Sequence, residues 1–187
     1  MKHLKFFAIT ALSIIYVNVV IGQTKPASAE VIIKEAEAEA AKTNKNVFVI
    51  FHASWCGWCH KMDNSMNDAK LKSFFDKNYV VVHLTVDESR DKKLLENPGA
   101  AELRKKYNGE LQGLPYWFIL DAKGNLLADS RLKTGNAKAV SVGCPASKEE
   151  VNYFVQVLKK TATLNSEQLT LIEDRFLKNG EVNNALK

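Results

Sequence analysis

Short apolar runs alternate with amphipathic segments along most of the chain, and this alternation predicts the order of its secondary-structure elements. Residues 47–51, 79–86 and 116–120 are rich in β-branched and aromatic side chains, which is typical of strands buried on both faces. A turn at residues 122–125 leads into a further short strand at 126–128. The predicted helices cover residues 29–43, the segment from Cys56 to Met66, residues 68–75, residues 89–107 with a break at 97–99, residues 147–160 and residues 166–179.

Strands separated by helices indicate an α/β fold in which a βαβ unit with parallel strands is followed by a hairpin. The chain has 187 residues, which is enough for one domain with a small appendage. Its hydrophobic content of 46% and charged content of 25% are those of a globular protein. The formal net charge is +5, but Lys and Glu are interspersed, whereas a nucleic-acid binder concentrates basic charge on one face. We therefore expect no nucleic-acid partner.

The first 22 residues have the organisation of a secretory signal peptide. A short basic start precedes a largely apolar stretch at residues 6–22. A retained membrane anchor is the alternative, because the stretch is close to the lower limit of spanning length. We expect cleavage after Gly22, and the small-x-small sequence that ends at Ala29 is a second candidate. The mature protein is then exported, to the periplasm or the medium, where disulfide chemistry is possible.

The strongest candidate for chemistry is the sequence Trp-Cys-Gly-Trp-Cys at residues 55–59, between a predicted buried strand and a predicted helix. The unpaired N–H groups and partial positive charge of a helix N-terminus stabilise a thiolate on Cys56. Cys59, one turn into the helix, is placed to attack a mixed disulfide formed by Cys56, and Gly57 allows the tight turn between them. We therefore interpret Cys56 as an exposed, acidic nucleophile and Cys59 as its shielded resolving partner.

Three other interpretations of the cysteine pair are weaker. A structural zinc site normally needs a second Cys/His pair at similar spacing, and the sequence has none, so we expect no metal. The pair could instead form a static disulfide. With His60, it also matches the C-x-x-C-H pattern of covalent haem, but a small cytochrome would be all-helical rather than α/β. We expect no haem and no other bound cofactor.

Three segments together resemble the thioredoxin superfamily. They are residues 51–59 (Phe-His-Ala-Ser-Trp-Cys-Gly-Trp-Cys), residues 83–87 (His-Leu-Thr-Val-Asp) and residues 113–115 (Gly-Leu-Pro). The chain is similar to the thioredoxin-like domains of exported thiol-disulfide oxidoreductases, including the C-terminal periplasmic domain of the membrane disulfide-interchange reductase. The resemblance implies a thioredoxin-like fold, a central mixed β-sheet flanked by helices, with an N-terminal helix. We expect this domain at residues 23–163, and a C-terminal helical extension at residues 164–187.

The same resemblance implies roles for residues around the cysteines. Pro115 would be a cis-proline packed against the disulfide, and the backbone of Leu114 would pair with an extended substrate. Tyr116 or Trp117 would line an apolar groove for that substrate, but only one of them can, because side chains alternate along a strand. The residues expected to shape the active site are Trp55, Gly57, Trp58 and Pro115.

Some positions depart from the thioredoxin pattern. Thioredoxins usually hold a buried Asp, which assists proton transfer, at the position of Ile50. His83 and His52 are our candidates for this proton transfer, since histidine titrates near neutral pH; the alternative is that both are structural. Trp58 replaces the Pro common within the thioredoxin motif, so the redox potential of thioredoxin does not carry over.

These inferences predict a thiol-disulfide oxidoreductase that acts on protein disulfides, as a reductase or isomerase rather than an oxidase. Its partners would be disulfide-containing or thiol proteins, together with a thiol electron donor or acceptor, which a membrane protein could provide. The alternative is a redox-inactive thioredoxin-fold module that binds peptides and keeps a structural disulfide. We interpret the third cysteine, Cys144, as buried and inert.

Overall fold

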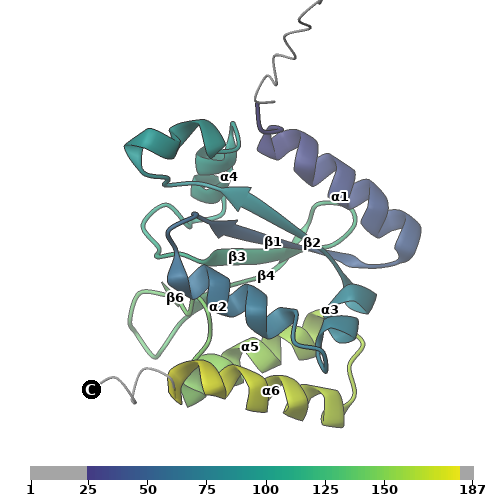
Figure 1. The fold of residues 1–187 in the computed structure, drawn as a ribbon. Helices are drawn as coiled ribbons and strands as arrows, with labels where there is room; N and C mark the ends of the chain where they lie inside the picture. The colour runs from purple at the N-terminus through teal and green to yellow at the C-terminus, as the bar shows by residue number, and fades with distance from the viewer. Residues whose placement is uncertain (1–24, 182–187) are drawn as a thin grey trace, which may run out of the picture.

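The computed structural model describes residues 25–181, and a mixed four-stranded sheet lies at its centre (Figure 1). The predicted signal peptide therefore lies outside the described residues. The strand order is β2-β1-β3-β4; β1 pairs with β2 in parallel and with β3 antiparallel, and β3 pairs with β4 antiparallel. The elements are α1 (Ala29–Thr43), β1 (Asn46–His52), α2 (Gly57–Met66), α3 (Lys72–Asn78), β2 (Tyr79–Thr85), η1 (Arg90–Leu95), α4 (Ala100–Lys106), β3 (Tyr116–Leu120), β4 (Leu126–Asp129), β5 (Arg131–Leu132), β6 (Val140–Ser141), α5 (Lys148–Thr161) and α6 (Ser166–Glu181).

The two central strands are buried on both faces, as their continuous apolar sequences predict. All residues of β3 and the five central residues of β1 are buried. Their side chains alternate between two cores: Phe48 and Trp117 belong to one, Phe51 and Phe118 to the other. Both cores are rich in aromatic contacts, among them Phe48 with Trp117 at 5.4 Å and Phe51 with Phe118 at 5.7 Å between ring centroids.

Helices cover both faces of the sheet. Helices α1 and α4 lie on one face, and α2, α3, α5 and α6 contribute to the core on the other (Figure 1). Helix α1 begins where predicted, because the Ser28 side chain accepts a hydrogen bond from the Val31 N–H. Helix α5 begins with a capping box between Ser147 and Glu150. Within residues 25–181, none of these helices combines the length and apolar character needed to cross a membrane.

Two features differ from the sequence-based expectation. The segment at 89–107 is broken at 97–99 as predicted, but its first part is a 3₁₀ helix, η1, rather than an α-helix. Gly99, at φ 80°, precedes α4 in a conformation that favours glycine. The short pair of strands β5 and β6 was not expected. The buried Ser130 joins this pair to β3, because its N–H donates to the Trp117 carbonyl and its own carbonyl accepts from the Val142 N–H. These bonds bring the segment after β6 beside the start of β3.

Helix α6 shares a core with the rest of the domain. Its Ile172 and Phe176 are fully buried, and the Phe176 ring lies 4.8 Å from that of Phe154 on α5. The prediction separates a domain that ends at residue 163 from an extension that begins at residue 164. In packing, α6 is continuous with the core beneath the sheet.

We expect Phe176→Ala to lower the free energy of unfolding by about 3–5 kcal/mol, because it removes a fully buried ring and leaves a cavity. Urea denaturation measures the loss. The control is Asp174→Ala on the exposed side of α6, which should change stability by about 0.5 kcal/mol or less. If the two substitutions cost the same, α6 does not fold with the domain as one unit.

Candidate active site

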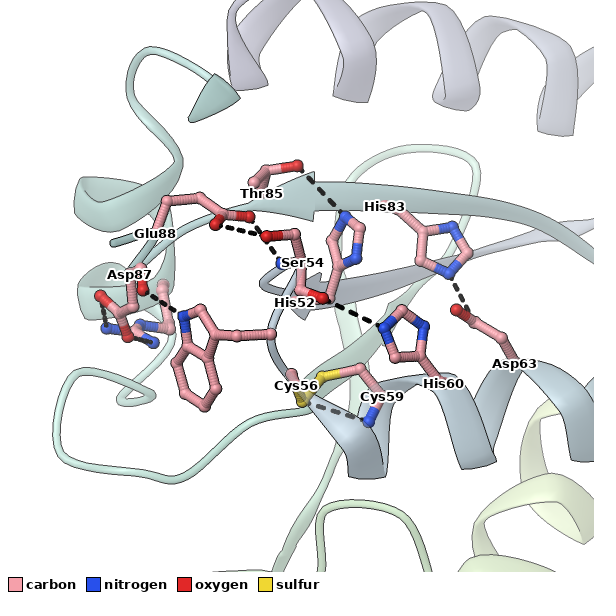
Figure 2. The surroundings of a disulfide bond; sticks show 12 residues. His52, Ser54, Cys56, Cys59, His60, Asp63, His83, Thr85, Asp87 and Glu88 are labelled. Atoms are coloured by element: carbon pink, nitrogen blue, oxygen red, sulfur yellow. Dashed lines mark hydrogen bonds and ion pairs between the residues drawn. A yellow bond between two sulfur atoms is a disulfide. The ribbon is translucent and has the colours of Figure 1, made fainter. Parts of the chain in front are cut away.

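Cys56 and Cys59 form a disulfide at the beginning of α2, so the predicted pair is joined (Figure 2). The S–S distance is 1.96 Å and the Cα atoms are 5.3 Å apart. Strand β1 ends at His52, and a short loop leads to Cys56, which caps α2: the Cys59 N–H points at Cys56 Sγ at 3.1 Å. One of the N–H groups at the helix N-terminus therefore donates a hydrogen bond to the sulfur of Cys56.

The exposure of the two cysteines differs from the expectation. Cys56 was expected to be exposed, but only 3% of it is accessible, close to the 1% of Cys59. The reason is local packing, because Ala53 and Leu114 close over the disulfide in a small apolar cluster. Access to Cys56 from solvent therefore depends on the side chains around it.

Two tryptophans provide the exposed surface of the motif. Trp55 is 60% exposed and its indole N–H donates to the Asp87 carbonyl at 2.8 Å. Trp58 is 39% exposed, and the Lys61 ammonium lies 4.2 Å from the centre of its ring. Large exposed aromatic side chains held by specific contacts are well suited to contact another chain.

The predicted proline directly follows Leu114, which packs against the cluster that contains the cysteines. The Leu114–Pro115 peptide bond is cis. Leu114 packs against the cluster of Ala53, Cys56 and Cys59. A pocket of about 210 Å³ is lined by Leu114, Trp58 and Gly143, among other residues.

Tyr116 and Trp117 do not reach this surface. One of the two was expected to face a peptide groove, but both are fully buried. The alternation of side chains along β3 is as expected, yet each face of this central strand is covered by helices. The Tyr116 hydroxyl donates to the Tyr107 carbonyl and the Trp117 indole to the Gly143 carbonyl, which satisfies both polar groups internally.

The two candidate histidines lie between α2 and the sheet, and a carboxylate accompanies them (Figure 2). Ile50, at the position where thioredoxins usually have an acid, is 1% exposed and lies in the apolar core. His83 Nε2 instead lies 2.8 Å from Asp63 Oδ1. The ring of His52 is 5.2 Å from that of His83, and its Nε2 is 3.2 Å from Thr85 Oγ1.

Asp63 was missed by sequence reasoning. Asp63 follows Cys59 by four positions, so the two residues share one face of α2. That spacing was visible in the sequence. Its meaning depends on the contact with His83 on β2, which the sequence does not show.

His52 is held mainly in its neutral form. Burial lowers the pKa of His52 below its ordinary value, and the neighbouring His83 lowers it further. Asp63 and Glu88 act in the opposite direction but do not reverse the shift. A neutral imidazole near neutral pH can accept a proton, as a base must.

Cys144 is buried, with 4% exposure, and the Asn179 side-chain N–H donates to its sulfur at 3.4 Å. Burial raises the pKa of the Cys144 thiol to about 12, which leaves little thiolate at neutral pH.

Over residues 25–181, no group of three or more His, Cys, Asp or Glu side chains is arranged to hold a metal ion.

Several solved structures are similar to the chain. Disulphide isomerase from Xylella fastidiosa Temecula1 is 24% identical, with a TM-score of 0.46 over 60% of this chain and 79% of that one. The oxidised C-terminal domain of DsbD from Neisseria meningitidis is 17% identical, with a TM-score of 0.44 over 73% and 97% of the two chains. A thioredoxin from Thermus thermophilus is 18% identical, with a TM-score of 0.43 over 72% and 85%. No match was found among curated proteins.

The family comparison covers the site itself. The family described as Thioredoxin-like domain matches residues 33–139, which run from α1 to the residue before β6. The matched part contains the Cys56–Cys59 disulfide, the cis bond before Pro115 and all four strands of the main sheet. It spans more than half of the 187 residues, and the predicted fold is confirmed: the chain belongs to the Thioredoxin-like domain family.

Proposed function

We propose that the protein is a thiol-disulfide oxidoreductase that reduces or isomerises disulfides of other proteins through Cys56 and Cys59. The observation that carries this proposal is the position of Cys56 at the start of α2, where the Cys59 N–H points at its sulfur. After reduction, the same N–H and the helix end stabilise a thiolate on Cys56. Cys59 lies inside the first turn of α2 rather than at its cap, so we assign the nucleophile to Cys56.

The reaction moves two electrons and needs no bound cofactor. The Cys56 thiolate attacks one sulfur of a substrate disulfide; that S–S bond breaks, and one substrate thiolate leaves. Cys59 loses its proton and attacks Cys56 Sγ, which forms the Cys56–Cys59 disulfide and releases the second substrate thiolate. The released thiolates take up protons at neutral pH. A dithiol protein, soluble or bound to a membrane, then returns two electrons to the pair.

The proton of Cys59 needs an acceptor, and the histidine cluster supports one. Asp63 and His83 are hydrogen-bonded, and His52 lies against His83. These groups replace the carboxylate that other thioredoxins have at the position of Ile50. We propose that His83 or His52 takes this proton, with Asp63 orienting His83.

The substrate would be an extended segment lying over Leu114. Its backbone would pair with that of Leu114, and its side chains would contact the exposed rings of Trp55 and Trp58. The pocket between Leu114, Trp58 and Gly143 favours a small apolar side chain next to the substrate cysteine. Tyr116 has no part in this contact, because it is fully buried.

The burial of both cysteines favours a second candidate, a redox-inactive module that binds peptides beside a structural disulfide. In that case the tryptophan surface alone would hold the partner. The two functions differ in one property: whether the Cys56–Cys59 bond exchanges with external thiols.

We expect Cys59→Ser to accumulate disulfide-linked complexes with substrate proteins, because Cys56 attacks and nothing resolves the product. Cys56→Ser should accumulate few. Both variants carry Cys144→Ala, and the complexes are counted on non-reducing gels after rapid acid quenching. Equal amounts of trapped complex in the two variants would show that the assignment of Cys56 as the nucleophile is wrong. A wild-type disulfide that resists reduced glutathione, with no trapping by either variant, would support the peptide-binding module.

We also propose that the protein is exported, and we expect the exported form to begin at Gln23. Cleavage after Ala29 would remove Ser28, which caps α1, and the carbonyl of Ala27, which accepts from the Asn97 side chain. N-terminal sequencing of protein recovered from the periplasm or medium checks this. A protein that begins at Glu30 would contradict the expected site, and an unprocessed chain at the membrane would indicate a retained anchor.

Acidification should weaken the fold through His52. The pKa of His52 is lower in the folded protein than its ordinary 6.5, mainly because of burial, so the unfolded chain binds its proton more readily. The contribution of His52 to stability is therefore complete above pH 6.5 and is lost as pH falls below it. Urea unfolding at pH ~7.5 and ~5 should show a smaller loss for His52→Gln than for the wild type. The exposed control, Lys42→Gln, should lose as much as the wild type; the same loss for His52→Gln would refute this role.

A further inference from the structure

A buried carboxylate grips the loop that precedes Cys56. Glu88, on the segment after β2, is 4% exposed. One of its oxygens accepts the Ser54 backbone N–H at 2.6 Å, and the other accepts the Ser54 hydroxyl at 2.8 Å (Figure 2). The Ser54 carbonyl lies 3.2 Å from His60 Nε2, so every polar group of Ser54 has a partner. We call the paired bonds between Glu88 and Ser54 the Glu88 clamp.

Asp87, the residue before Glu88, is hydrogen-bonded to Trp55, the residue after Ser54. Asp87 has a left-handed backbone, at φ 53°, and Arg104 binds its carboxylate with two hydrogen bonds, at 2.7 and 3.2 Å. In this conformation the Asp87 carbonyl accepts the Trp55 indole N–H. Two consecutive residues after β2 therefore hold the two consecutive residues that lead into Cys56.

Residues of the 3₁₀ segment η1 and just after it make hydrogen bonds to both residues of the Glu88 clamp. The Glu88 N–H donates to Glu96 Oε1 at 2.7 Å, and the Lys92 ammonium lies 3.3 Å from the Ser54 hydroxyl. Asn97 closes the segment onto β2, because its side chain accepts the Thr85 N–H and its own N–H donates to the Thr85 carbonyl. The segment between β2 and α4 is thus hydrogen-bonded to β2 through Asn97 and to Glu88 through Glu96.

Glu88 is ionised in this setting. Burial alone would raise the pKa of its carboxyl, but the two bonds from Ser54, with Lys92 and His52 nearby, bring that pKa below its ordinary value. Removing a carboxylate from water is costly unless hydrogen bonds replace its hydration. Both carboxylate oxygens of Glu88 accept from Ser54, which lies two residues before Cys56.

We propose that Glu88 is a positioning residue of the redox pair: its clamp on Ser54 keeps Cys56 beside Cys59 and thereby sets how readily the disulfide is reduced. The connection is short, because the Cys56 N–H donates to the Ala53 carbonyl at 3.0 Å and Ser54 lies between them. Closing a disulfide is easier when the two thiols are already held together. The inference rests on the proposed redox activity of the pair and adds a residue on which its redox equilibrium depends.

The test is the equilibrium of Cys56–Cys59 with glutathione, measured by acid quenching and alkylation across ratios of reduced to oxidised glutathione. Glu88→Ala removes the clamp and should shift the equilibrium toward the dithiol roughly three- to tenfold, the size of about one lost hydrogen bond. Glu88→Gln can still accept the Ser54 N–H and donate to its hydroxyl, so it should stay within about twofold of the wild type. Ser54→Ala loses only the hydroxyl contact and should shift less, in the same direction.

Controls separate the possible outcomes. Glu35→Gln makes the same chemical change on the exposed side of α1 and should leave the equilibrium unchanged. If Glu88→Ala does not fold, Ser54→Ala and Glu88→Gln still decide the question. Equilibria within about twofold of the wild type for both alanine variants, or a shift for Glu88→Gln as large as for Glu88→Ala, would overturn the positioning role. A wild-type disulfide that does not exchange at all would overturn the proposed function instead, and this inference with it.

Discussion

The site depends on the register of β1 between its two neighbours. The antiparallel pairing of Phe51 with Tyr116 places the end of β1 beside the beginning of β3, and Leu114, just before β3, packs against the cysteine cluster. The parallel pairing of His52 with Thr85 brings the end of β2 to the same edge. Three loops from distant parts of the sequence therefore meet at one edge of the sheet. A shift of one residue would exchange the core faces of β1, so the two cores hold the register and the register holds the site.

Most of the fold could be read from local signals. The two central strands are continuous apolar runs, and the helix starts at Ser28 and Ser147 carry side-chain caps, so their ends are encoded within a few residues. The cysteine pair was recognised for the same reason, since a Cys-x-x-Cys sequence between strand and helix has its chemistry built into its spacing. Local patterns also suffice for Met62 and Met66, which line the core face of α2.

What escaped prediction depends on contacts between segments. The burial of Tyr116 follows from helices packed on both faces of β3, and strand alternation alone cannot indicate that. Asp63 gains its importance from His83 across the gap between α2 and β2, and Glu88 from Ser54 at a separation of 34 residues. Polar residues directly after a buried strand were a usable signal for Glu88, because strand ends at one edge of a sheet gather loops together. Its partner could be named only from the structure.

The last turn of α6 is linked through Asn179 to the surface around Trp58. Its side chain accepts from the Ser65 hydroxyl and donates to Cys144 Sγ, and its carbonyl lies 3.3 Å from the Lys61 ammonium, which also lies over the Trp58 ring. A helix outside the family-matched region is thus linked by contacts to an aromatic ring beside the disulfide. A substitution at Asn179 would therefore reach Trp58 through Lys61, while the cysteine motif and the sheet stay the same.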